Sequence, residues 1–436
     1  MSGHSAPVQE IRFESITVEA DFPVTLGELV RTEDGRWYGL VQSQSRSAVR
    51  VLPLDPPEEL SAGTQLTFTG RTATSKAAGV SFGSVVDPLG RSFYNLPVSS
   101  SPAQKPPTED FFGLGNLGDT MVLHRSEGVA LLGSPPGGFP SLFSQIAAAQ
   151  QADHLYILCQ GSVRELRAYC DAVQFAGNSG NTLIIWTPPW QQTALRNMAP
   201  QFLTALVNDH PVPGDSLILI DDLHHWLNGV REYGETLGEI LLPDGFPSST
   251  RRQFAELLDL KSSSGEREST TSLIVGWRFD EAYSPLVEHP YMARLPRFLK
   301  TGFFLDEHSE YLVPSPDSWG ELSPLGRAWR KLCAIESDSG EELRPILSLL
   351  QHIFAQLFIE YQPLRAPYPY GMDERPQFTA ADEPLLIGLA RSLRPADAEQ
   401  LLRLRAELNL HFREPPRAQR QIFLDYLRKD SKEMRA

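Results

Sequence analysis

The sequence predicts a multidomain protein with a small N-terminal β-barrel, a central α/β domain built on a doubly wound parallel sheet, and a C-terminal α-helical domain. Three observations predict this. Short β-rich segments separated by turns occupy the first 95 or so residues, apolar strand-like runs then alternate with helical stretches, and helix-period apolar patterns occupy the last third. The 436 residues provide enough chain for two or three such domains.

The β-barrel is predicted for residues 10–98. Its strands are rich in β-branched and aromatic residues and are separated by Gly, Asp, Pro and Ser, as in "WYGLVQ", "AVRVLPL" and "QLTFTG". Residues 99–110 ("SSSPAQKPPTED") contain few side chains that could build a core. We therefore expect a Ser/Pro linker there.

The central α/β domain is predicted for residues 111–325. Five short runs are apolar at most positions, which is typical of parallel strands buried on both faces: "GVALLG", "HLYILC", "NTLIIWT", "DSLILIDD" and "TSLIVGW". Helical stretches such as "SVRELRAYCDAVQFA" and "QFLTALVNDH" lie between them and complete βαβ units.

The C-terminal helical domain is predicted for residues 326–436. The segments "ELRPILSLLQHIFAQLFIEY" and "ADAEQLLRLRAELNLHF" both repeat apolar residues at steps of three and four, which is the helical period.

Composition excludes several classes of function. The formal net charge of −15 argues against a nucleic-acid partner, because phosphate neutralisation needs clustered Lys and Arg. The three cysteines have no metal-type spacing, and they are too few for a disulfide framework. No apolar run is long enough to span a membrane, and the N-terminus lacks the pattern of a signal peptide. We therefore expect a reducing, cytosol-like compartment.

One glycine-rich stretch, "LLGSPPGGFPS" (residues 131–141), lies between an apolar strand and an apolar helix. Phosphate-binding loops of the pattern GxxxxGK[ST] have this layout, with a Lys that reaches the phosphates and a hydroxyl that holds Mg²⁺. Gly133 and Gly138 have the required spacing, but Phe139 stands at the Lys position and Pro140 at the hydroxyl position. The loop is either a degenerate phosphate loop or an ordinary strand-to-helix turn.

Two further segments show a resemblance to a known family. "VVDPLGR" (Val85 to Arg91) and "LILIDDLHHWLNGVREYGETLGEILLPDGFP" (Leu217 to Pro247) both occur in the order in which the family has them. The chain resembles the alpha and beta subunits of F-type ATP synthases and their relatives, which include type III secretion and flagellar ATPases. The resemblance implies that residues 111–325 form a RecA-like nucleotide-binding fold and that the glycine-rich loop is its degenerate P-loop.

The second segment places several residues on family positions. Asp221 and Asp222 end the strand that carries the Walker B acid, Arg231 falls on a family arginine, and Phe246-Pro247 stand for a Tyr-Pro pair. The resemblance implies that Asp221 is a site position where a carboxylate can hold a Mg²⁺-bound water. The alternative is an acidic pair that caps the next helix. Because Pro140 replaces the metal-binding hydroxyl, we expect no metal site.

A third position indicates the branch of the family. Gln160 stands at the end of the strand after the P-loop helix, where catalytic beta subunits carry a glutamate and alpha subunits a glutamine. A neutral amide cannot serve as the base that a hydrolytic site needs. The alpha branch therefore fits better.

The arginine finger of alpha subunits is the fourth position. In the stretch "LVPSPDSWGELSPLGRAW", the finger falls on Pro324, or on Gly326 after a shift by two residues. We expect the finger to be lost, although a rearranged loop could bring Arg327 or Arg330 into its place.

Other conspicuous residues have simpler interpretations. The adjacent His224 and His225 point to different faces of a helix, so we interpret them as core or surface residues and not as a metal pair. Asp280 and Glu281 follow a strand and are interpreted as part of a solvated turn.

The sequence thus predicts a non-catalytic, alpha-like pseudo-ATPase subunit of an F-type ATP synthase-like rotary ring. We expect no catalytic residues, weak or absent binding of ATP and ADP, and a catalytic beta-type subunit as partner in a hexameric ring. The complex would lie on the cytoplasmic side and contact the membrane only indirectly. The alternatives are an adaptor or regulator related to type III secretion and flagellar ATPases, or a weak nucleotide-binding protein. The vestigial site positions are Gly133, Gly138, Phe139, Pro140, Gln160 and Asp221.

Overall fold

The computed structural model describes residues 4–12, 15–72, 80–97, 127–133, 138–150, 152–209, 213–262, 270–278, 291, 294–299 and 301–304. The predicted linker (99–110) and the predicted helical domain (326–436) lie outside these residues. The chain divides into two compact units, which are described separately. The first comprises residues 1–108, 125–130 and 139–299, and the second comprises residues 109–124, 131–138 and 300–436.

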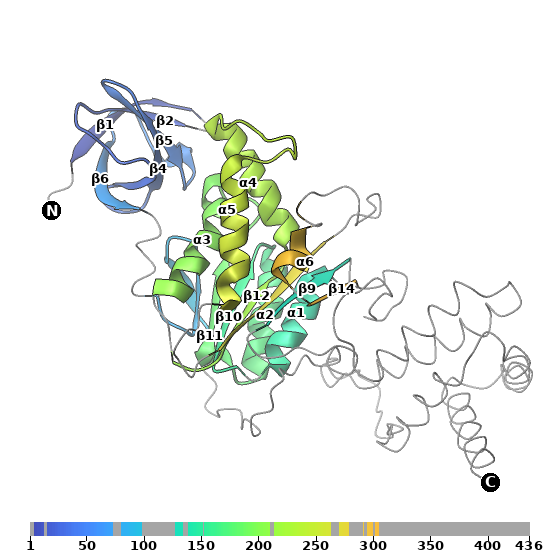
Figure 1. Ribbon diagram of the computed structural model, residues 1–436. Helices are drawn as coiled ribbons and strands as arrows, with labels where there is room; N and C mark the ends of the chain where they lie inside the picture. The colour runs from blue at the N-terminus through green and yellow to red at the C-terminus, as the bar shows by residue number, and fades with distance from the viewer. Residues whose placement is uncertain are drawn as a thin grey trace, which may run out of the picture. The chain divides into compact units, whose positions relative to one another are not determined.

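The first unit begins with a closed β-barrel, drawn in blue in Figure 1. Its strands follow the order β1-β2-β5-β4-β3-β6, and each pairs with its neighbours antiparallel where their registers are defined. A closed barrel leaves no unpaired edge strand. The strands are β1 (Ser5–Ile11), β2 (Ile16–Glu19), β3 (Glu28–Thr32), β4 (Tyr38–Gln44), β5 (Ala48–Pro53) and β6 (Gln65–Thr72). A short 3₁₀ helix, η1 (Pro57–Glu59), follows β5.

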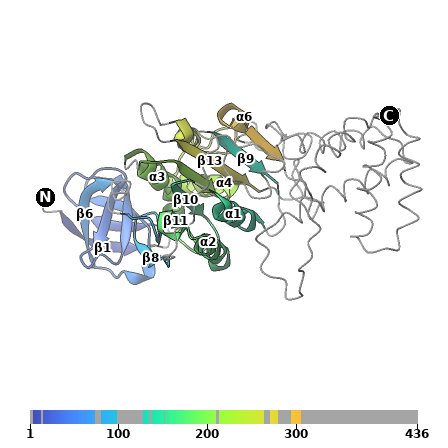
Figure 2. The ribbon, with the colours of Figure 1, turned by 90° about the horizontal axis from the view of Figure 1, so that it is seen from below.

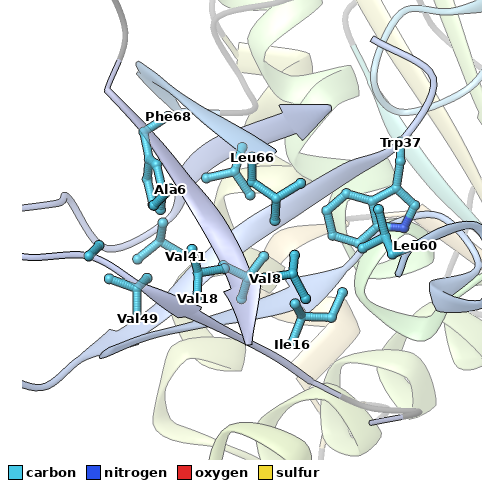
Figure 3. Packing of buried hydrophobic residues seen from close by; sticks show 13 residues of the cluster. Ala6, Val8, Ile16, Val18, Trp37, Val41, Val49, Leu60, Leu66 and Phe68 are labelled. Carbon is cyan, nitrogen blue, oxygen red and sulfur yellow. The ribbon is translucent and has the colours of Figure 1, made fainter. Parts of the chain in front are cut away.

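Side chains that alternate along the strands fill the barrel. On β2, for example, Ile16 and Val18 are fully buried, whereas Glu19 is exposed. The core also contains Leu66 and Phe68 of β6 and Trp37, which precedes β4, and Figure 3 shows them in the same cluster as Val18 of β2 and Val41 of β4. Each fully buried side chain of this kind contributes about 1.5–3 kcal/mol to stability. The predicted barrel is therefore present.

The first unit continues with a mostly parallel sheet in the order β9-β13-β12-β10-β11-β7-β8. All five apolar runs predicted as buried strands form strands of this sheet, and parallel registers join β13 to β12, β12 to β10 and β10 to β11. The strands are β9 (Gly128–Leu132), β10 (His154–Cys159), β11 (Thr182–Trp186), β12 (Ser216–Ile220) and β13 (Thr271–Trp277). The predicted α/β sheet is thus confirmed.

Two strands that fall inside the predicted barrel segment belong to this sheet instead. β7 (Ser84–Val86) pairs parallel with β11, and β8 (Ser92–Asn95) pairs antiparallel with β7. All three residues of β7 are buried, which is the environment of a parallel sheet and not the one-sided burial of a barrel strand. The barrel itself runs from Ser5 to Thr72.

Helices follow the strands of the sheet. They are α1 (Gly138–Ala149), α2 (Val163–Phe175), α3 (Thr193–Asp209), α4 (Leu223–Leu237), α5 (Ser248–Leu258) and the short α6 (Leu295–Phe298), with 3₁₀ turns η4 (Ser179–Asn181) and η5 (Asp259–Ser262). Figure 2 shows α1 and α2 side by side on one side of the sheet and α3 on the other. No helix among the described residues is long and apolar enough to cross a membrane.

Local sequence explains where two of the helices begin. Ser162 and Glu165 form a capping box at the start of α2, in which each side chain bonds the backbone N–H of the other residue. The Asp222 side chain accepts from the N–H of His225 at the start of α4, and Gly238 ends that helix with a left-handed φ of 71°.

Of the second unit, the structure describes Leu131–Gly133, Gly138 and β14 (Thr301–Phe304). Leu131 and Leu132 are the buried end of β9, so this unit contains the exit of that strand and the first residue of α1.

Candidate functional site

The candidate site lies at the strand-to-helix turn after β9. Gly133 and Gly138, the two predicted P-loop glycines, have φ angles of 127° and 78°. Residues other than glycine rarely adopt such angles, so the turn depends on glycine at both ends. Residues 134–137 between them lie outside the described part of the chain.

Phe139, the residue predicted to stand at the P-loop lysine position, is fully buried in the first unit. Its ring packs edge-on against Phe143 of the same helix, with 5.6 Å between ring centroids. It also lies over Gly276 of β13, where an added Cβ would approach the ring to 2.8 Å. The residue that would reach the phosphates in a working loop is therefore part of the hydrophobic core. Pro140, at the hydroxyl position, is buried as well.

Asp221, the predicted Walker B position, is the residue after β12 and is buried. Its carboxylate accepts from the Gln160 N–H, with N–O distances of 3.1 and 3.3 Å, and from the Tyr169 hydroxyl at 3.5 Å. Burial, with smaller contributions from the charges of Asp222 and Glu165, raises the pKa of Asp221 to about 7. The carboxylate of Asp221 therefore lies in the protein interior, where it contacts Gln160 and Tyr169.

Gln160 lies beside Asp221, as the predicted site requires. The residue is 8% exposed, and neither atom of its side-chain amide has a hydrogen-bond partner among the described residues. Its backbone N–H is the group that contacts the carboxylate of Asp221. The structure therefore brings Gln160 and Asp221 together, and the side chain at the predicted glutamate position is a neutral amide.

Asp222 has the capping role that was the alternative interpretation of the acidic pair. Its Oδ1 accepts from the His225 N–H at 3.0 Å, and its Oδ2 lies 3.9 Å from Nε of Arg278. Burial raises the pKa of Asp222, while the hydrogen bond from His225 opposes this shift. Asp221 and Asp222 therefore have different surroundings.

The two adjacent histidines point to different neighbours. The ring of His224 packs edge-on against Trp277, with 5.9 Å between centroids, and His225 Nε2 lies 3.3 Å from Arg196 Nη1. Burial lowers the pKa of His225. Among the residues that the structure describes, no group of three or more His, Cys, Asp or Glu side chains could hold a metal ion.

The Phe246-Pro247 pair is buried at the start of α5. The ring of Phe246 packs edge-on against Tyr291 at 4.8 Å, and Pro247 lies so close to Gly234 of α4 that an added Cβ would overlap its ring. Arg231 is exposed on α4 and faces Glu235, 3.9 Å away. The packing of Phe246 and Pro247 therefore fixes the connection between α4 and α5.

Several predicted positions lie outside the described residues: Asp280, Glu281, Pro324, Gly326, Arg327 and Arg330. Sequence reasoning missed two residues that shape the site, Gly276 and Tyr169. A glycine inside the apolar run "TSLIVGW" was the available signal for Gly276, because glycine in a strand often marks a close approach by another group. Tyr169 gave no signal, since it reads as an ordinary apolar position of α2.

Comparison with known proteins gives matches in sequence and in fold, and one negative result. No protein-family model matches the sequence. ATP synthase subunit alpha 2 from two strains of Cereibacter sphaeroides is 28% identical over 220 residues, which cover 45% of this chain and 43% of that protein. The chain thus matches less than half the length of these relatives.

The fold has a counterpart among solved structures. The assembled ATPase EscN of the enteropathogenic E. coli type III secretion system superposes with a TM-score of 0.61 over 88% of this chain and 94% of that one, at 15% identity. At this identity the match shows the fold alone. The sequence match confirms the predicted resemblance to ATP synthase alpha subunits, and the barrel followed by a RecA-like core confirms the predicted fold for the part of the chain that the structure describes.

Proposed function

We propose that this chain is a non-catalytic, alpha-like subunit of an ATPase ring related to the F-type ATP synthases, with a catalytic beta-type subunit as its partner. The similarity in sequence to an ATP synthase alpha subunit and in fold to the EscN ATPase supports membership of such an assembly. The surroundings of the degenerate loop support the non-catalytic role.

The burial of Phe139 carries this proposal. A P-loop lysine must extend toward the terminal phosphates, where its charge offsets theirs. Phe139 is instead 0% exposed and packs on Gly276 and Phe143. Its side chain contributes to the stability of the core, and it has no charge to offer a phosphate.

The remaining site residues do not fit Mg²⁺–ATP either. Pro140 has neither the hydroxyl that would hold Mg²⁺ nor the backbone N–H that helix N-termini offer to anions. Gln160 has no carboxylate to orient an attacking water, and the carboxylate of Asp221 is buried and already accepts from Gln160 and Tyr169. ATP and ADP would therefore bind weakly or not at all, and no step of hydrolysis is assigned to this chain.

In the ring, such a subunit would shape the interface beside the partner's catalytic site. The described residues do not include the finger region around Pro324, so the contribution of this chain to that site rests on the resemblance alone. The complex would be located on the cytoplasmic side and reach the membrane through other subunits.

The fold match to a secretion ATPase favours one alternative, an adaptor or regulator of a type III secretion-type or flagellar ATPase. A chain with this fold and a non-catalytic loop could cap or regulate such a ring. The third possibility, a weak nucleotide-binding protein, would keep a shallow site at Gly133 and Gly138.

Reconstitution tests the proposal. The purified chain is mixed with the catalytic beta-type subunit of the same cell, and assembly and ATP hydrolysis are measured. We expect a hetero-oligomer whose hydrolysis stops when the beta-type lysine is replaced and is unchanged when Phe139 is replaced by Leu. Failure to assemble with the beta-type subunit, together with assembly on a secretion-type ATPase, would favour the regulator. Hydrolysis by this chain alone would contradict both.

A further inference from the structure

A pocket of about 470 Å³ lies in the first unit beside β8, the last strand in the order of the described sheet. The stretch that follows β5, the strand β8 and the turn that follows β11 all contribute to its lining. Its volume is within the range of about 300–1,000 Å³ that is usual for small-molecule sites. None of the residues predicted for the nucleotide site lines it. We call it the aromatic pocket, for the three side chains described next.

Three aromatic side chains line the aromatic pocket, and two of them are open to solvent. Trp190 is 67% exposed and Phe93 is 46% exposed, whereas Trp186 is 8% exposed. Large rings stabilise a protein when they are buried, and exposed apolar side chains that cluster around a hollow are typical of binding surfaces. The accessible faces of Trp190 and Phe93 therefore indicate a ligand that contacts aromatic rings.

The three rings stand at steep angles to one another. Trp186 packs against Phe93 with 5.0 Å between ring centroids and 65° between planes, and against Trp190 with 5.9 Å and 83°. Nε1 of Trp186 donates to the carbonyl oxygen of Gly161 at 2.8 Å, which fixes the orientation of the central ring. Rings arranged in this way offer aromatic surface from several directions, as the aromatic cages that bind methylated ammonium groups do.

The charged residues of the lining disfavour an anion. Arg91 is the cationic residue of the lining, and it donates to both acidic residues, Asp55 and Asp87. Burial raises the pKa of Asp87. The lining is neutral when Asp87 is protonated and has one excess negative charge when Asp87 is ionised. In neither state does it offer the net positive charge that an anion needs.

The ring angles also disfavour a flat ligand. A nucleobase gains most from stacking on an aromatic face, and Trp186 is parallel to neither of its two aromatic neighbours. A methylated ammonium ion is compact and positively charged, and its surface consists of C–H groups. It can therefore contact several rings at once, whose faces are electrically negative.

We propose that the aromatic pocket binds a methylated ammonium group, held by Phe93, Trp186 and Trp190. Two sources offer this group: free molecules of the choline type and trimethylated lysine side chains of other proteins. The site is separate from the predicted nucleotide site, and the inference does not rest on the proposed ring function.

Isothermal titration calorimetry of the full chain tests the proposal with three probes. They are choline, the acetylated amide of trimethyl-lysine, and the uncharged isostere of choline in which carbon replaces the nitrogen. We expect saturable binding of choline or the lysine probe, at least about tenfold tighter than that of the isostere, because only a cation is attracted by the ring quadrupoles. Tighter binding of the lysine probe would identify a protein side chain as the source, and tighter binding of choline a free molecule.

Substitutions of Trp190 locate the site, and the exposure of this residue allows the variants to fold. Trp190→Leu should weaken the binding about tenfold or more, because leucine has no π face, and Trp190→Phe should retain most of it. Phe175→Leu is the matched control, since Phe175 on α2 is 79% exposed but does not line the pocket. Its affinity should equal that of the unaltered chain.

Three results would overturn the proposal. They are no saturable binding of choline or of the lysine probe, equal affinity for choline and its uncharged isostere, and equal affinity of the Trp190→Leu and Phe175→Leu variants for the probe that binds.

Discussion

The ring of Phe139 lies against the backbone of Gly276, at a position where a single added methyl group would approach the ring to 2.8 Å and the backbone oxygen of Asp221 to 2.7 Å. This contact joins the helix that follows the degenerate loop to the neighbouring strand β13. It also explains how an aromatic residue is accommodated at the predicted P-loop lysine position. The absence of a side chain at Gly276 provides the space.

The first prediction concerns this contact. Gly276→Ala should lower the free energy of unfolding by about 1–3 kcal/mol, because the added methyl group overpacks the core. Chemical denaturation monitored by circular dichroism measures the change. Gly229→Ala on α4 is the matched control, since nothing lies within 4 Å of its added Cβ. The control should be neutral or stabilising by up to about 1 kcal/mol, because alanine is the better helix former. Equal losses in both variants would contradict the contact.

The second prediction concerns the loop itself. Phe139→Lys combined with Pro140→Thr should destabilise the chain by about 3 kcal/mol or more, because it places an unpaired charge where a fully buried ring lies. The same double substitution should give no measurable binding of Mg²⁺–ATP in fluorescence or calorimetric titrations. Phe139→Leu serves as the control for lost packing without charge. Tight ATP binding by the double variant would mean that the phosphate site is intact and lacks only its two polar residues.

The third prediction concerns pH. The pKa of Asp221 is raised by burial from 3.8 to about 7, so the folded state binds more protons than the unfolded state between these values. The stabilising contribution of the protonated form is fully present below about pH 4 and is lost as pH rises toward about 7. Within this window, unfolding free energy should fall with pH by as much as about 1.4 kcal/mol per unit from this group.

Asp221→Asn isolates that contribution, because the amide does not titrate. The difference in unfolding free energy between the unaltered chain and Asp221→Asn should shrink or reverse as pH rises from about 4 to 7 and then stay level. Burial also raises the pKa values of Asp87 and Asp222, but they are present in both proteins, so they largely cancel. A difference that is constant with pH would show that Asp221 ionises normally.

The fourth prediction concerns the ion pair that joins the barrel to the sheet. Nη1 and Nη2 of Arg91 donate to the two carboxylate oxygens of Asp55 at 2.8 Å, and Nε donates to Asp87. Lysine cannot reproduce this planar arrangement, so Arg91→Lys should cost about 2 kcal/mol of stability. Thermal denaturation measures it. The exposed pair of Arg36 and Asp34 offers a control, and Arg36→Lys should change stability by less than about 0.5 kcal/mol. Equal effects would mean that the Arg91 pair adds nothing beyond a surface contact.

Much of the fold was predictable because its signals are local. The five central strands could be recognised since strands buried on both faces of a parallel sheet are apolar at almost every position. The barrel strands could be recognised as β-rich segments separated by turn residues. The placement of β7 was not predictable from its sequence, because three residues carry no period, and their neighbour in the sheet, β11, lies about a hundred residues away along the chain.

The candidate site was predictable in part. Spacing and family resemblance identified Phe139, Gln160 and Asp221, and the structure brings the last two into contact. The inward position of Phe139 depends on Gly276, which is far away along the sequence. The raised pKa of Asp221 depends on burial. Neither feature could therefore be predicted from residues nearby in the sequence.

Native mass spectrometry of the tagged chain purified from its own cells tests the central claim most directly, since it weighs the complex and any bound nucleotide together. The account predicts a hetero-oligomeric ring that contains a beta-type subunit and whose nucleotide content is accounted for by the beta-type subunits alone. A monomer, a complex without any ATPase subunit, or one nucleotide bound for each copy of this chain would contradict it.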